Sequence, residues 1–180
     1  FEDTPFYMEV YLNAKRCKIL NEYMHFRRRR EGSVTTQFDK HYMDIIPMTN
    51  ILLDIFKKYD KYDSYKRGLL NFKVTFTRKK YADVFENREK LFNTVREDFL
   101  KVKDNYIEKE DIENFFYPYN EAFFSGIIEN PEFEKFEILN KVKLLEIENK
   151  KLKKELKRWE EFKSKKPIKA YIKLKNKFRY

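Results

Sequence analysis

The sequence predicts a short α/β segment over residues 1–36, followed by a mainly α-helical region that ends in a short coiled coil. The α/β segment is indicated by one helix-length apolar stretch and two short strand-like passages. The helical region is indicated by composition, because the 180-residue chain holds only 3 Gly and 5 Pro while 39% of its residues are charged. Long helices with solvated faces suit so polar a chain, whose mean hydropathy is −0.83.

The first segment opens with Phe1-Glu2-Asp3-Thr4-Pro5-Phe6. Pro5 at a first-turn position predicts a helix that starts near residue 5 and ends at Lys15-Arg16, whose charges suit a helix C-terminus. Two short strands are expected next, at Cys17–Leu20 and Tyr23–Arg27, with the Cys17 thiol in the core.

A helical accessory region is predicted for residues 37–130, where apolar residues recur at helical spacing. Pro47 falls in the first turn of one expected helix, where proline is tolerated. The expected helices are Asp44–Lys58, Tyr65–Phe85, Leu91–Val102, Lys109–Tyr117 and Tyr119–Ile128.

A coiled-coil helix is predicted for residues 131–163, between the helix start at Asn130-Pro131-Glu132 and the helix breaker Pro167. Residues along one seam alternate at spacings of four and three, which is a heptad repeat. Asn149 falls at an a position, where a buried amide favours two strands in fixed register. The stretch Ile138–Trp159 therefore either pairs two copies of the chain or packs back on the helical region. The seam consists of Ile138, Val142, Leu145, Asn149, Leu152, Leu156 and Trp159.

The formal net charge is +10, and such an excess attracts nucleic acid, phosphorylated ligands or an anionic membrane surface. Residues 164–180 form a basic amphipathic tail. Over Lys163–Tyr180 there are eight Lys or Arg and no acid, so this stretch either lies on an anionic membrane or stays solvated. No apolar run approaches the roughly 20 residues of a membrane span.

Two polar groups are candidates for chemistry. Glu2 and Asp3 supply carboxylates that could deprotonate an attacking hydroxyl, or that could simply favour a helix N-terminus. Four consecutive arginines, Arg27–Arg30, lead into the Gly32-Ser33 turn, where guanidinium and backbone N–H groups could hold a diphosphate. A solvated loop and a nucleic-acid contact are the alternatives for the arginines. No Cys/His cluster with metal-ligand spacing occurs in the sequence.

The order of these motifs resembles the end of the catalytic domain of family 2 glycosyltransferases. Members that build cell-surface polysaccharides commonly show an aromatic-Glu-Asp motif, a helix followed by Ala-Lys-Arg-Ile, and an aromatic strand that ends in Tyr-Arg-x-Arg-x-Gly-Ser-Ile-Thr. This chain has Phe1-Glu2-Asp3, then Ala14-Lys15-Arg16 with Ile19, then Arg27–Arg30 running into Glu31-Gly32-Ser33-Val34-Thr35. The resemblance covers residues 1 to about 36, and Arg27 stands where the family usually has an aromatic residue.

The resemblance implies the end of a glycosyltransferase A-type domain and an inverting transfer of a sugar from a nucleotide-diphosphate donor to a glycan or lipid-linked acceptor hydroxyl. It makes Asp3 the catalytic base with Glu2 beside it, and it places Arg28, Arg30 and Ser33 at the donor diphosphate. The nucleotide-binding half and its Asp-x-Asp segment are not in this sequence. We therefore expect the C-terminal part of a larger enzyme, inactive alone, whose Mg or Mn ion is held by the other half and not by this chain.

The resemblance further implies a cytoplasmic location, peripheral on the inner face of the cell membrane. The rival hypothesis is a non-enzymatic helical scaffold that binds nucleic acid or an anionic surface through its arginines and its basic tail. We prefer the enzyme and do not expect nucleic acid as a partner, because a scaffold leaves the acidic pair and the Gly-Ser turn unexplained.

Overall fold

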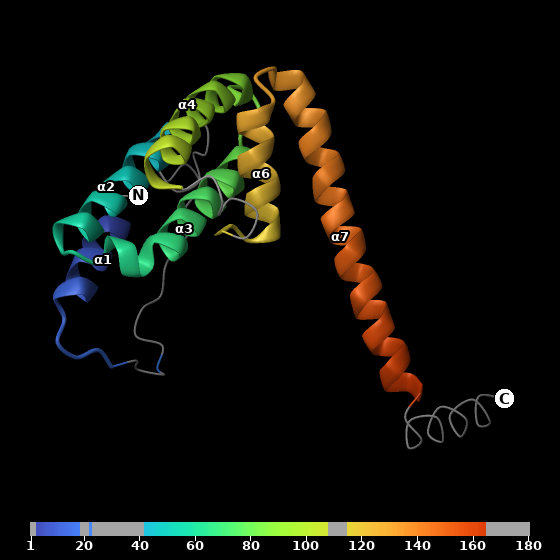
Figure 1. The fold of residues 1–180 in the computed structure, drawn as a ribbon, viewed down its shortest axis with the longest axis horizontal. Helices are drawn as coiled ribbons and strands as arrows, with labels where there is room; N and C mark the ends of the chain where they lie inside the picture. Colours follow the sequence, from blue (N-terminus) through green and yellow to red (C-terminus); the bar gives the residue numbers. More distant parts are fainter. Residues whose placement is uncertain (1–2, 19–21, 23–41, 108–114, 165–180) are drawn as a thin grey trace. The chain divides into compact units, whose positions relative to one another are not determined.

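The computed structural model describes residues 3–18, 22, 42–107 and 115–164. The chain divides into two compact units, the first covering residues 1–137 and the second covering residues 138–180. Among the described residues, the first unit includes five helices, a short 3-10 helix and the first turn of α7, and the remainder of α7 belongs to the second unit (Figure 1). The elements are α1 (Asp3–Asn13), η1 (Tyr42–Asp44), α2 (Ile45–Lys58), α3 (Tyr62–Asp83), α4 (Arg88–Tyr106), α6 (Pro118–Glu129) and α7 (Phe133–Ser164).

The prediction of an α/β segment over residues 1–36 is wrong, because the described residues form helices and include no strand. The helix expected near residue 5 is present as α1, and it packs on α2. Cys17, expected in a strand and in the core, is non-helical and exposed, and most of the two expected strands lies outside the described residues. A pair of short strands is marginally stable by itself, whereas a helix gains burial from a single neighbouring helix.

The helical part of the prediction is confirmed from residue 44 onward in the described ranges. The helices expected at residues 44–58, 65–85 and 91–102 correspond to α2, α3 and α4. Helix α6 includes Pro118 instead of starting after it, since proline in a first turn lacks only an N–H that would have no helical partner there. The helix expected at Lys109–Tyr117 falls largely outside the described residues.

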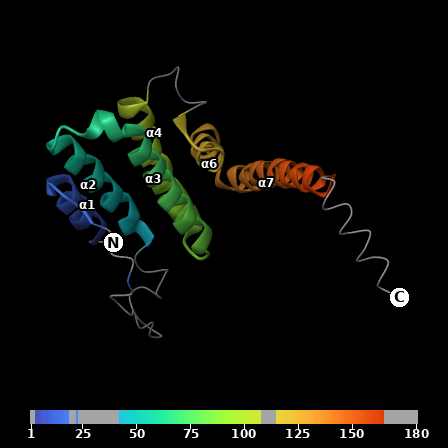
Figure 2. The same cartoon turned by 90° about the horizontal axis from the view of Figure 1, so that it is seen from below.

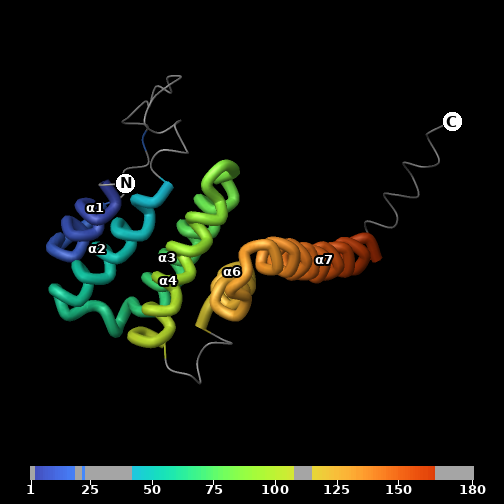
Figure 3. Tube along the Cα trace, turned by 90° about the horizontal axis from the view of Figure 1, so that it is seen from above, coloured from blue at the N-terminus to red at the C-terminus, as the bar shows by residue number. Residues whose placement is uncertain are grey.

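Helix α3 is at the centre of the first unit, where it contacts α2, α4 and α6. Helices α1 and α2 lie side by side at one edge (Figures 2 and 3). Aromatic rings fill the space between α3, α4, α6 and the first turn of α7. Tyr81 meets Phe136 edge-to-face at 5.7 Å between ring centroids, and Phe99 meets Phe123 in the same way at 6.1 Å. The most deeply buried rings are Tyr81, Phe92, Phe99, Phe123, Phe124 and Phe136.

A pair of buried amides joins α3 to α6. The Asn71 side chain accepts a hydrogen bond from the Tyr117 backbone N–H at 2.9 Å and another from the Asn120 amide at 3.1 Å. Asn71 in turn donates to the Phe115 carbonyl at 3.0 Å. These bonds satisfy backbone groups at the start of α6 that no helical partner could reach. They fix where α6 begins on the surface of α3.

The two described helical glycines differ in the space around them, which gives a matched test of the packing. A Cβ at Gly68 on α3 would meet nothing within 4 Å, so Gly68→Ala should stabilise the fold by about 0.4–1 kcal/mol. A Cβ at Gly126 on α6 would stand 3.3 Å from the ring of Phe136, which is fully buried and cannot withdraw. We therefore expect Gly126→Ala to destabilise, by about 1–3 kcal/mol. Urea unfolding of both variants is the measurement, and equal effects would contradict the described contact between α6 and Phe136.

Candidate functional site

Helix α1 carries the one predicted site residue that the structure describes, Asp3. This residue begins the helix, and its side chain is exposed. The positive end of the helix dipole stabilises a carboxylate at this place. A solvent-accessible carboxylate is what a general base for an incoming hydroxyl requires.

Helix α1 is held on α2 by both apolar and polar contacts. Met8 and Leu12 are half-buried against the core. The Glu9 carboxylate accepts a hydrogen bond from Lys58 at 2.8 Å and another from the Tyr59 hydroxyl at 2.9 Å. These bonds lower the pKa of Glu9, and the same carboxylate raises the pKa of Lys58. The pairing is exposed and adds little energy, so its main effect is to fix the rotation of α1 about its own axis.

The opposite face of α1 is apolar but uncovered in the described structure. Phe6, Tyr7, Val10 and Tyr11 are each between 48% and 64% exposed. Apolar side chains thus occur on both sides of α1, one side of which packs on α2. Helices that are apolar all round are buried within larger assemblies, and a contiguous exposed apolar patch marks an interaction surface. The outer face of α1, defined by these four residues, is therefore a candidate docking face.

The other predicted site residues, Glu2, Arg28, Arg30 and Ser33, lie outside the described residues. The structure thus places Asp3 alone and does not test whether the arginines converge on it. Within the described ranges, no group of His, Cys, Asp and Glu is arranged to hold a metal ion. None of the helices described is both long enough and apolar enough to cross a membrane.

Comparisons of the chain with protein-family models, with curated proteins and with solved structures found no match.

A buried ion pair that the sequence patterns did not reveal lies where α2, α3 and α4 meet. The Lys73 ammonium is 2.6 Å from the Asp98 carboxylate, and the two side chains are 1% and 10% exposed. Lys73 also donates to the Asn50 side chain at 2.7 Å and to the Thr49 hydroxyl at 3.1 Å, while Asn50 donates to Asp98 at 3.1 Å. Every member of this cluster is thus bonded to another member.

Burial lowers the pKa of Lys73, while the attraction of the Asp98 carboxylate opposes that change. A lysine of this kind can serve as a catalytic base or nucleophile only where a substrate can reach it. Lys73 is nearly inaccessible, and its three donor positions face Asp98, Asn50 and Thr49. We therefore assign the cluster to the architecture of the helical unit and not to catalysis.

The sequence does contain a pattern that indicates this pair, namely one charged residue on the apolar face of each of two predicted helices. Lys73 lies between Leu70 and Val74 on α3, and Asp98 lies between Val95 and Phe99 on α4. Opposite charges on two core-facing surfaces predict a buried pair, because either charge alone would be too costly to bury.

A second polar junction binds the start of α7 to the first unit. The Tyr81 hydroxyl donates to Glu137 at 2.7 Å, and Arg88 approaches the same carboxylate at 3.5 Å. Burial raises the pKa of Tyr81 well above its ordinary value, and the bond to Glu137 raises it further. Tyr81 therefore remains a neutral donor over the physiological pH range.

Removing one partner of the buried pair should be far more costly than removing one partner of an exposed pair. Lys73→Met leaves the Asp98 carboxylate buried without its counter-ion, and we expect a loss of about 3–5 kcal/mol in the free energy of unfolding. Replacing both residues, as Lys73→Met with Asp98→Leu, should recover much of that loss. The measurement is urea unfolding followed by circular dichroism, since Trp159 lies exposed on α7 and its fluorescence would not report on this core.

The control is Lys151→Met, which removes the partner of Glu155 in an exposed pair on α7, 3.9 Å apart. It should change stability by no more than about 0.5 kcal/mol. An effect of Lys73→Met as small as that of Lys151→Met would contradict the role given to the buried pair.

Proposed function

We propose that this chain is the acceptor-side, C-terminal portion of an inverting family 2 glycosyltransferase that builds cell-surface glycans. In this proposal α1 presents Asp3 to the acceptor, and the helical unit carries α1. The arginines and the serine of the segment Arg28 to Ser33 contact the donor diphosphate. The basic stretch Lys163–Tyr180 holds the enzyme at the cytoplasmic face of an anionic membrane, where lipid-linked acceptors are found.

The observation that best supports the proposal is the form of α1. The helix begins at Asp3, one side of it packs on α2, and its outer face of Phe6, Tyr7, Val10 and Tyr11 is apolar and uncovered. An exposed apolar face of this kind marks an interaction surface. A nucleotide-binding half docked on that face would cover the apolar residues and would bring the donor sugar to the end of α1 where Asp3 lies.

The reaction that these groups would perform is a single displacement. The acceptor hydroxyl attacks the anomeric carbon of the donor sugar, and Asp3 takes the hydroxyl proton as the new carbon–oxygen bond forms. The bond between that carbon and the diphosphate oxygen breaks, and the nucleoside diphosphate leaves with the bonding electrons. Arg28 and Arg30 are suited to stabilise the charge that develops on this leaving group.

A divalent ion, which would further stabilise the leaving diphosphate, belongs in this proposal to the nucleotide-binding half. The described residues offer no cluster to hold such an ion. In this proposal the chain contributes the base, the arginines and the positioning of α1.

A non-enzymatic scaffold that binds an anionic surface is the second candidate, and the net charge of +10 favours it. That hypothesis explains the basic tail equally well. An apolar outer face on α1 suits a binding scaffold as well, so the two candidates are separated by the assay of Asp3 below.

The test of the proposal is Asp3→Asn in the full-length glycosyltransferase, assayed by release of nucleoside diphosphate from a panel of nucleotide sugars with acceptor present. Loss of the base should lower the turnover number by about 10²–10⁴-fold and leave donor binding unchanged, because Asn keeps the size of the side chain but cannot take the proton.

Asp63→Asn is the matched control, since Asp63 is also an exposed acid in the first turn of a helix, α3. It should leave turnover unaltered. Wild-type turnover in the Asp3→Asn enzyme would rule out this residue as the base, and absence of any transfer by the unsubstituted enzyme would overturn the proposed function itself.

A further inference from the structure

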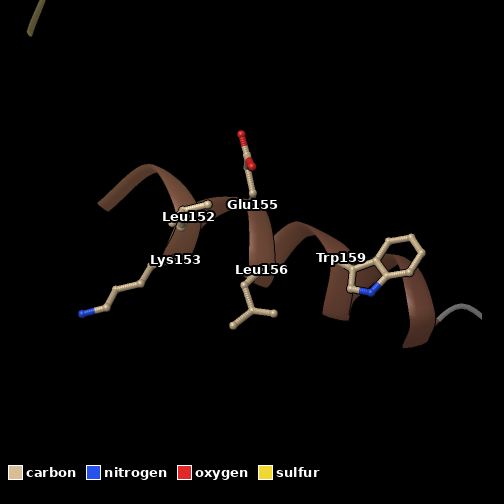
Figure 4. A pocket seen from close by; sticks show the side chains of 5 residues that line it. All are labelled: Leu152, Lys153, Glu155, Leu156 and Trp159. Atoms are coloured by element: carbon tan, nitrogen blue, oxygen red, sulfur yellow. The ribbon is translucent and has the colours of Figure 1, made fainter. Parts of the chain in front are cut away.

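Helix α7 carries a second uncovered apolar surface, which is independent of α1. From Ile138 onward the helix runs to Ser164, and the six apolar residues of its seam are between 47% and 67% exposed. Leu152, Leu156 and Trp159 line one open hollow on this helix (Figure 4). The seam consists of Ile138, Val142, Leu145, Leu152, Leu156 and Trp159.

The spacing of the seam fixes a heptad position for every residue of the helix. Val142, Asn149 and Leu156 take a positions, and Ile138, Leu145, Leu152 and Trp159 take d positions. Asn149 at the central a position can bond only to a partner that offers a matching polar group at the same level. In a parallel, in-register pair that partner is the Asn149 of a second copy.

The charges that flank the seam agree with the same arrangement. In a parallel pair a g residue faces the e residue five positions further along the other chain. Lys141 at g then faces Glu146 at e, and Glu148 at g faces Lys153 at e. Both contacts are attractive, and each occurs twice because of the twofold symmetry. Only Glu155, which faces Glu160, meets a like charge.

An antiparallel pair fits less well. There an a residue faces a d residue of the other chain, so Asn149 would face leucine and its amide would be buried without a partner. The end of the seam is also consistent with the parallel pair. Trp159 stacks on Phe162 at 5.6 Å, and the next a position is Lys163, where two like charges would meet and stop the coil.

We propose that residues 138–159 of α7 bind a second copy of this chain as a parallel, in-register, two-stranded coiled coil. The proposal stands on the seam, Asn149 and the flanking charges, and it does not depend on the glycosyltransferase assignment. If the chain belongs to an enzyme at a membrane, the dimer would carry two acceptor-binding portions and two basic tails.

The register is tested by spin labels at Lys143, Lys150 and Lys157, each introduced as a single cysteine in a Cys17→Ser chain. All three are b positions, directed away from the seam. A parallel, in-register pair gives the same label-to-label distance at all three sites by pulsed electron paramagnetic resonance. In an antiparallel pair, each step of one heptad moves the two labels in opposite directions along the coil and changes their separation along it by about 21 Å. The three label-to-label distances therefore cannot all be equal.

The outcomes separate the possible occupants of the seam. Equal distances together with the mass of a dimer support the proposal. A dimer with unequal distances overturns the parallel register. A monomer at all concentrations overturns the proposal, since the seam would then be covered by its own chain or by a different protein.

The flanking charges are tested by the dissociation constant of the dimer, measured by sedimentation equilibrium. Glu148→Lys and Lys153→Glu each convert two attractive contacts into repulsive ones and should weaken dimerisation about tenfold. The double variant restores opposite charges and should return to within about twofold of the unsubstituted chain. Lys157→Glu, a charge reversal at a b position, is the control and should have little effect. Failure of the double variant to recover would contradict the proposed pairing.

Discussion

The buried Lys73–Asp98 pair is the constraint on which the first unit depends. It joins α3 to α4, and through Asn50 it also reaches α2. Any slip of one helix along another would leave one charge without its partner in a core made largely of Phe, Leu and Ile side chains. The hydrophobic contacts of such a core are individually non-directional, so the polar cluster selects one arrangement among several that bury similar area. The Lys73 cluster thus sets the register of α2, α3 and α4, and the neighbouring elements are added to that framework.

Helix α1 is one of those added elements, and in the proposed function it carries the catalytic base. Since α2 is fixed by the core, Glu9 and the half-buried Met8 and Leu12 hold α1 in a defined orientation on it. Asp3 is thereby carried at the exposed end of a rigid support. The outer face of α1 remains free to receive another protein surface. The helical unit therefore supports one short helix, α1, in a defined orientation. In the proposed dimer, α7 joins two such units.

The sequence predicted best those features that depend on local pattern. The apolar periodicity of α2, α3 and α4, the proline at the start of α6 and the heptads of α7 each specify a helix from neighbouring residues. Prediction from the sequence failed for features that depend on contacts between residues far apart in the chain. The segment around Cys17 has strand propensity, but the part of it that is described has no strand to pair with and stays irregular. Lys73 and Asp98 were missed because the charge on the apolar face of each helix points to a pair only when the two helices are considered together. The sequence predicted Asp3 at the start of a helix, whereas the packing of one side of that helix on α2 came from the structure.

The most direct test of the proposed function is a structure of the full-length protein with a nucleotide-sugar donor bound. We expect the outer face of α1 to be covered by the nucleotide-binding half, and the Asp3 carboxylate to face the anomeric carbon across a space that fits one acceptor hydroxyl. That hydroxyl would lie within hydrogen-bond reach of Asp3, at about 2.6–3.2 Å. A structure in which Phe6, Tyr7, Val10 and Tyr11 stay in solvent and Asp3 is remote from the donor would contradict the proposed role of α1.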